Sequence, residues 1–117
     1  MKRFLVHFFL TITIFCFSAP VIAAQDQETK ITNLENKVSK KFSKTFCNST
    51  GFGISSEGAL RFSIGETKGE FSKNPLIEKV DIERVKEKIL VDISDSCYFF
   101  DISKNDLDNL ILEKNNQ

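Results

Sequence analysis

Apolar residues recur every three or four positions along most of this 117-residue chain. The clearest run consists of Ile31, Leu34, Val38, Phe42 and Phe46. Intervals of three and four place these side chains on one side of an α-helix, and the strict alternation of a half-buried strand is not followed. Spacing of this kind continues through almost all of the chain after the first 24 residues, so the sequence predicts an all-α fold.

A second helix is predicted after a turn. Residues 48–53 have the polar and glycine content of a turn, and Ser55 or Ser56 is placed to cap the new helix. This helix is expected to run to about Lys73, because Asn74 precedes a proline and is therefore disfavoured in helical geometry.

A third helix and a short fourth one complete the predicted bundle. Asp81 can cap the third helix, which should end near Cys97. Ser103 and Asp106 have a spacing like that of a capping box at the start of the last helix. The apolar residues expected to face the core are Ile82, Val85, Ile89, Leu90 and Ile93 in the third helix, and Leu107, Leu110 and Ile111 in the fourth. The prediction is an up-down bundle of three helices plus a short C-terminal helix.

The first 24 residues have the pattern of a secretory signal peptide. Lys2 and Arg3 precede an apolar run of about 14 residues, shorter than the roughly 20 that a membrane-spanning helix needs. Small residues favour cleavage after Ala23 or Ala24, which would leave a helical domain over residues 25–114 and a frayed tail at 115–117. The alternative is an uncleaved anchor running to Ala24.

Cleavage would remove the only histidine, His7. The mature chain could then form neither a Ser-His-Asp or Cys-His catalytic site nor a metal centre that needs imidazole. The whole chain has 16 basic and 16 acidic residues, and loss of Lys2 and Arg3 leaves a small acidic excess. This balance gives no general signal for nucleic-acid binding. We expect no metal and no cofactor.

Two cysteines remain after cleavage, Cys47 and Cys97. An even pair in an exported protein favours a disulfide, and in an up-down-up bundle the ends of the first and third helices lie at the same pole. On an ideal wheel Cys47 points away from the apolar stripe, so the bridge would need the first helix to end by Phe46. The alternatives are two free buried thiols or a redox-active pair.

The second helix has two distinct sides. Leu60, Ile64, Thr67 and Phe71 project to one side, and Gly58, Phe62, Gly65 and Gly69 project to the other. Glycine inside a helix costs up to about 1 kcal/mol relative to alanine, so a face with three glycines suggests close approach by another helix. Either the last helix or the first loop packs there, with Phe62 in the core, or the glycine face is a shallow docking groove with Phe62 as an apolar anchor. We favour the internal packing slightly.

Charged residues elsewhere are expected to be solvated surface. The first helix carries a lysine stripe that could touch an anionic membrane or an acidic partner, although a solvated face is the simpler interpretation. The stripe includes Lys37, Lys40, Lys41 and Lys44. Three carboxylate pairs are expected to be surface groups and not acid-base sites. They are Glu66 with Glu70, Glu83 with Glu87, and Asp92 with Asp95.

Three stretches resemble small exported proteins of unknown function from marine cyanobacteria. They are residues 46–55 (FCNSTGFGIS), residues 61–75 (RFSIGETKGEFSKNP) and residues 95–98 (DSCY), and the resemblance covers about half of the chain. It implies the periplasm or the thylakoid lumen as the compartment and assigns no activity. In general character the chain is also similar to small helical lumenal factors that assist photosystem II, which implies an accessory role.

The sequence thus predicts a non-enzymatic, disulfide-bonded helical protein that binds a protein partner outside the cytoplasm. The alternative is a carrier of a lipid or another small apolar ligand, held between helices by aromatic rings. An internal cavity lined by those rings would favour the carrier, whereas a solid core with an exposed Phe62 would favour docking. The rings in question are Phe42, Phe46, Phe62 and Phe71.

Overall fold

The computed structural model describes residues 19–97 and 102–110, without the side chains of residues 19–22. The chain divides into two compact units, Met1–Lys30 and Ile31–Gln117. In the first unit the described residues form the start of helix α2 (Ala19–Gly51). Residues 23–30 are all exposed there. Most of the predicted signal peptide, and the predicted frayed tail, lie outside the described residues.

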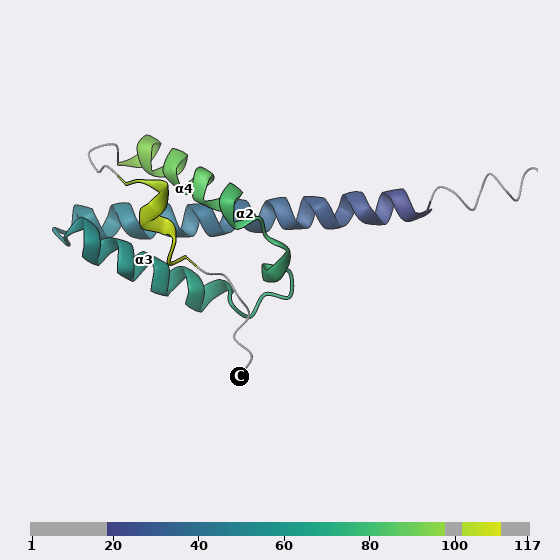
Figure 1. Cartoon of the computed structure of the whole chain (residues 1–117), viewed down its shortest axis with the longest axis horizontal. Helices are drawn as coiled ribbons and strands as arrows, with labels where there is room; N and C mark the ends of the chain where they lie inside the picture. Colours follow the sequence, from purple (N-terminus) through teal and green to yellow (C-terminus); the bar gives the residue numbers. More distant parts are fainter. Residues whose placement is uncertain (1–18, 98–101, 111–117) are drawn as a thin grey trace, which may run out of the picture. The chain divides into compact units, whose positions relative to one another are not determined.

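The second unit is an all-α bundle, as predicted (Figure 1). It contains α2 from Ile31 onward, α3 (Ser56–Phe71) and α4 (Ile82–Ser96). Two short 3-10 turns, η1 (Ile77–Lys79) and η2 (Lys104–Leu107), follow α3 and α4 respectively. No strand occurs in the described parts of the chain.

Polar contacts show how the helices of this unit lie against one another. Lys41 of α2 forms an ion pair with Glu70 of α3 at 2.8 Å. The Ser43 Oγ atom of α2 lies 3.5 Å from the carbonyl oxygen of Ile89 in α4. With a short turn before α3 and with the ends of α2 and α4 joined by a disulfide, the three helices run up, down and up.

Helix α2 ends later than predicted. It runs through Cys47 to Gly51, so the turn is limited to Phe52 and Gly53, and the expectation that the helix must end by Phe46 is wrong. The last carbonyls are satisfied by a Schellman arrangement, in which Ile54 N–H donates to Ser49 O at 3.1 Å and Gly53 N–H to Thr50 O at 3.0 Å. Gly53 has a φ of 89°, a conformation that favours glycine.

The predicted caps of the next two helices are confirmed. Ser55 caps α3 by accepting a hydrogen bond from Gly58 N–H at 3.2 Å, and Asp81 caps α4 by accepting from two backbone N–H groups. Helix α3 ends at Phe71, two residues before the predicted Lys73. Helix α4 ends at Ser96 with Cys97 as its C-cap, as expected.

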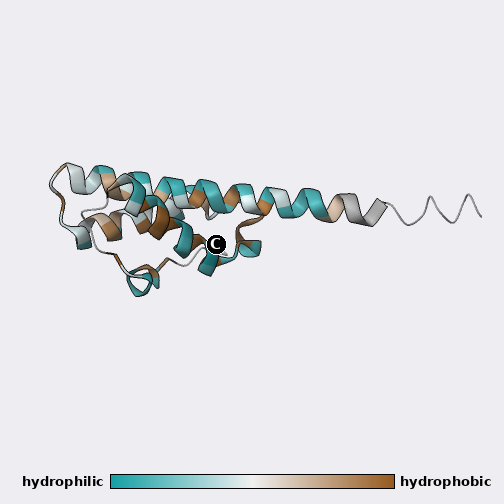
Figure 2. Cartoon of the chain, turned by 90° about the horizontal axis from the view of Figure 1, so that it is seen from above, coloured by the Kyte–Doolittle hydropathy of each residue, from teal (hydrophilic) through white to brown (hydrophobic). Residues whose placement is uncertain are grey.

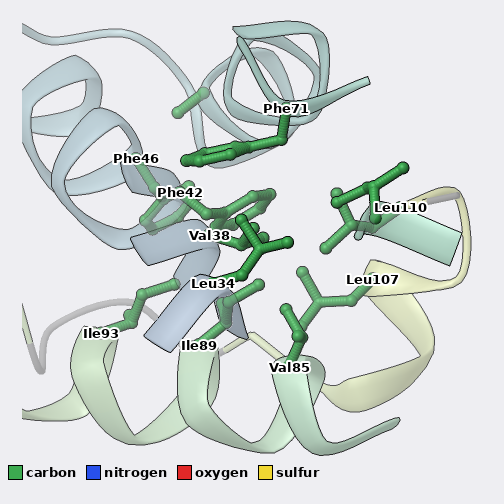
Figure 3. Packing of buried hydrophobic residues seen from close by; sticks show 12 residues of the cluster. Leu34, Val38, Phe42, Phe46, Phe71, Val85, Ile89, Ile93, Leu107 and Leu110 are labelled. Atoms are coloured by element: carbon green, nitrogen blue, oxygen red, sulfur yellow. The ribbon is translucent and has the colours of Figure 1, made fainter. Parts of the chain in front are cut away.

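The core forms where the apolar sides of the three helices meet (Figure 3). Along α2, hydrophobic residues recur between hydrophilic ones, as the spacing predicted (Figure 2). Leu107 and Leu110 close the core, but residues 104–107 form a single 3-10 turn where a short helix was predicted. Ile111 lies outside the described residues. The buried hydrophobic residues are Leu34, Val38, Phe42, Phe46, Ala59, Phe71, Ile77, Val85, Ile89, Ile93, Leu107 and Leu110.

A disulfide joins Cys47 to Cys97, with the two Cα atoms 5.7 Å apart. It links the last turns of α2 to the C-cap of α4, so the predicted pairing is confirmed. Cys47 forms the bridge from within α2, so the pairing does not need the helix to end by Phe46. Both cysteines are half-buried against the core.

Candidate functional site

The four residues singled out on the second helix lie on the side of α3 that faces away from the core. Phe62 is 51% exposed, Gly65 and Gly69 are exposed, and Gly58 is half-buried. The expectation that this side packs inside the bundle, with Phe62 in the core, is therefore wrong. We call these four residues the α3 outer face.

The buried side of α3 is made by other residues. Three of them, Ala59, Ser63 and Thr67, are small and permit close approach to the neighbouring helices without glycine. Leu60 and Ile64 of the predicted apolar side are only half-buried at its edge. The Ser63 and Thr67 hydroxyls have no hydrogen-bond partner among the described residues. The buried residues are Ala59, Ser63, Thr67 and Phe71.

The fold itself gives no steric reason for glycine at two positions of the outer face. A Cβ placed on Gly65 or Gly69 meets no atom of the described residues within 4 Å. Each glycine nevertheless costs the helix up to about 1 kcal/mol relative to alanine. The loss of helix stability caused by the two glycines is therefore not offset by packing within the described part of the chain.

Exposed apolar residues continue this surface at the N-terminal end of α3. The Ile54 Cγ2 atom would lie 3.1 Å from a Cβ placed on Gly58, so Ile54 adjoins the outer face. Ile54 is 45% exposed, and Phe52 in the preceding turn is 87% exposed. An exposed phenylalanine with neighbouring apolar groups is a feature of interaction sites.

Charges of opposite sign flank the α3 outer face. At 3.6 residues per turn, Arg61 and Lys68 lie along one edge together with Glu57, and Glu66 and Glu70 lie along the other. Lys41 of α2 already holds Glu70. Arg61 pairs with Glu57 at 2.6 Å, in an exposed pair of the kind that contributes little to stability. Glu66 and the half-buried Lys68 form no close ion pair with the described residues, although the charge of Glu66 acts on the nearby Lys41. Two charges of opposite sign thus lie beside the glycines.

The lysine stripe of α2 is mostly solvent-exposed. Lys37, Lys40 and Lys44 are exposed, and Lys41 is half-buried. A hydrogen bond to Glu70 raises the pKa of Lys41 above its ordinary value. Contact of this stripe with a membrane surface stays a prediction.

A fully buried carboxylate, Glu35, was not anticipated from the sequence. It accepts hydrogen bonds from the backbone N–H of Asp81 at 3.1 Å and from the guanidinium of Arg84 at 3.3 and 3.4 Å. Lys88 lies 3.7 Å away. Glu35 follows Ile31 by four residues and precedes Val38 by three, so its spacing already placed it on the buried stripe. Its contacts join α2 to the start of α4, which is a structural role.

An open cleft of about 330 Å³ lies between α2 and α4 near this carboxylate. Its charges nearly balance, and Arg84 and Lys88 already face Glu35, so the cleft favours neither anions nor cations. Asp92, one member of a predicted carboxylate pair, lies on its rim. The lining residues are Asn36, Ser39, Lys40, Arg84, Glu87, Lys88, Val91 and Asp92.

The Glu83 and Glu87 pair belongs to a surface network that attaches η2 to α4. Lys104 binds Glu83 at 2.9 Å and Glu87 at 3.3 Å. Lys86, only 7% exposed, binds Glu83 and Asp108 at 3.0 Å each. Both carboxylates are thus occupied by lysines, as expected for surface groups and not for an acid-base pair.

This network makes stability depend on pH. Hydrogen bonds from Lys104 and Lys86 lower the pKa of Glu83 below 4.5, and the Ser103 backbone N–H and hydroxyl lower the pKa of Asp106 below 3.8. A carboxyl with a depressed pKa stabilises the fold above its unfolded-state pKa, and this contribution is lost as the pH falls through the folded-state pKa. We therefore expect the melting temperature to decrease when the pH is lowered below about 4.

The lysines of the same network set the alkaline limit of the pH range in which the fold is most stable. A hydrogen bond to Asp108 raises the pKa of Lys86 above 10.5, and one to Glu83 does the same for Lys104. Their contribution is present below 10.5 and is lost as the pH rises through the raised pKa values. Thermal melts from pH 2 to pH 12 should show a plateau between these limits, and a melting temperature that rises steadily on acidification would contradict this assignment.

Comparison with known proteins returns no matching family model, curated protein or solved structure. Within the described residues, no helix is both long enough and apolar enough to span a membrane. The same residues contain no group of three or more His, Cys, Asp or Glu side chains placed to hold a metal ion.

Proposed function

We propose that this chain is an exported, non-enzymatic binding protein that docks a protein partner on the α3 outer face. Its place of action would be the periplasm or the thylakoid lumen, where it would serve as an assembly or accessory factor. Export is supported by the charged start, the short apolar run and the small residues before Gln25. The disulfide is consistent with an oxidising compartment.

One observation carries the docking proposal: Gly65 and Gly69 remain glycine where the fold leaves room for a side chain. Helix propensity alone favours alanine at both positions, by up to about 1 kcal/mol each. A partner backbone that approaches α3 closely would account for both glycines, and Phe62, half-exposed beside them, would supply an apolar anchor.

The carrier hypothesis requires four aromatic rings around one ligand. Phe42 and Phe46 are fully buried in the core and Phe71 is nearly so, whereas Phe62 is 51% exposed on the opposite side of α3. The rings therefore do not line one site, which favours docking over transport of an apolar ligand.

The test is capture of partners on immobilised protein from native periplasmic and membrane extracts, compared between wild type and Gly65→Leu. We expect Gly65→Leu to reduce capture at least tenfold, because a leucine would prevent close approach. It should raise the melting temperature by a few degrees, because leucine favours helix more than glycine does and meets open space.

Ser94→Leu is the matched control, since it adds the same side chain at an exposed position of α4. It should leave capture unchanged. The proposal fails if Gly65→Leu and Ser94→Leu capture the same proteins in the same amounts. A large fall in the melting temperature of Gly65→Leu would also contradict it, because that result would mean the glycine face is internal.

A further inference from the structure

We propose that the partner on the α3 outer face is a second copy of this chain, and that the two α3 helices pair side by side in parallel. This inference rests on the proposed function, because it uses the same surface, and it adds the identity of the occupant. The arrangement is a two-fold symmetric dimer, in which both copies present the same residues.

The charged residues along the two edges of α3 favour a second copy of the chain as the occupant and a parallel direction of the two helices. In a parallel symmetric pair, the basic edge of one α3 faces the acidic edge of the other on both sides of the contact. Arg61 then lies opposite Glu66 of the second copy, five residues further along, which is the offset of interhelical ion pairs in parallel helix pairs. By the same offset Lys68 lies opposite position 73, just after the end of α3, where Lys73 carries a like charge, so the attraction comes from the two Arg61–Glu66 pairs.

The antiparallel alternative has the wrong charges. In that arrangement each edge of α3 lies against the equivalent edge of the second copy. Arg61 and Lys68 would then approach Arg61 and Lys68 of the second copy. Glu66 and Glu70 would likewise approach acidic residues. Like charges at such positions are destabilising. Only the parallel direction therefore places Arg61 opposite an acidic residue.

Shape agrees with charge. Phe62 and Gly69 are seven residues apart and lie on one line, and Gly58 and Gly65 lie on the neighbouring line. In a parallel pair, Phe62 meets Phe62 of the second copy as an aromatic pair. The glycines before and after this layer allow the two backbones to approach, so that the rings are enclosed. Ile54, beside Gly58, would extend the contact at one end.

The dimer is expected to be weak. Helix α3 has 16 residues and is therefore about 24 Å long, which offers less than the roughly 800 Å² per partner of a standard interface. Association should lie in the micromolar range or weaker, and it should weaken further in high salt, because exposed ion pairs are screened.

Sedimentation velocity tests this on the purified protein with its disulfide intact, over a range of concentrations. We expect wild type to shift from monomer to dimer, and Gly65→Leu, Arg61→Glu and Glu66→Arg each to weaken dimerisation at least tenfold. A mixture of Arg61→Glu with Glu66→Arg should restore the dimer, because each copy then meets an opposite charge at both edges. A monomer at every concentration, or a dimer that these substitutions do not affect, would overturn the inference.

Cross-linking tests the direction. With Ser72→Cys and a short bismaleimide, a parallel dimer should be trapped through the two introduced thiols. In an antiparallel dimer centred on Gly65 the same thiols would be about 20 Å apart, so a failure to cross-link would overturn the parallel arrangement.

The two proposals fail separately. Protein that stays monomeric but still captures another protein in a manner sensitive to Gly65→Leu would refute self-association and leave docking standing. Loss of both behaviours would refute both.

Discussion

Reduction of the Cys47–Cys97 disulfide is expected to lower the melting temperature on the order of 20 °C. The bridge closes a loop across a sequence separation of 50 residues, for which chain entropy gives about 4 kcal/mol of stabilisation as an upper value. In a domain this small, the same 4 kcal/mol is a large part of the total stability, which is on the order of 5 to 15 kcal/mol. The linked elements, α2 and α4, also share the core contacts, so the reduced protein should still fold at low temperature.

Circular dichroism melts with and without reductant measure this effect. Complete reduction should be verified by alkylation and intact mass, because a half-buried disulfide reacts slowly. The double variant Cys47→Ser with Cys97→Ser serves as the control, since it should melt near the reduced wild type and should not respond to reductant. An unchanged melting temperature after verified reduction would show that the bridge does not stabilise this fold. Labelling of both thiols without reductant, in protein from its own compartment, would show that the bridge is absent there.

The helical framework could be predicted from the sequence because its signals are local. The apolar intervals of Leu34, Val38 and Phe42 describe one helix side, and all three residues are buried. The caps at Ser55 and Asp81 were also readable, because a cap needs only one polar side chain before a run of helix formers. The disulfide could also be predicted, because the cysteines lie near the ends of two helices and the up-down-up order brings those ends together.

The packing of Phe62 and the burial of Glu35 depended on information that is not local. The internal packing expected for Phe62 was wrong because a glycine stripe shows only that a backbone can be approached, not what approaches it. Ala59, Ser63 and Thr67 also permit close approach, and they make the buried side. Glu35 was overlooked because its burial depends on Arg84 and on the N–H of Asp81, both distant in sequence. The late end of α2 has a local cause, because the left-handed residue of the Schellman turn is Gly53 and not Gly51.

The same substitution at two phenylalanines separates the core from the docking face. Phe42→Ala should cost about 3 to 5 kcal/mol, because it removes a fully buried ring from the centre of the core and leaves a cavity. In a domain of this size that loss should lower the melting temperature by 15 °C or more, on the order of the disulfide effect. Phe62→Ala removes an identical set of atoms from a half-exposed position, so its cost should be within about 1 kcal/mol.

Binding should respond in the reverse order. Phe62→Ala is expected to weaken both dimerisation and partner capture at least tenfold, because it removes the apolar anchor of the α3 outer face. Phe42→Ala, measured at a temperature where it remains folded, should bind like wild type. Thermal melts and sedimentation on the same two samples give both measurements. If Phe62→Ala proves as destabilising as Phe42→Ala, then its ring packs in the core after all, and the assignment of the α3 outer face as a docking surface is wrong.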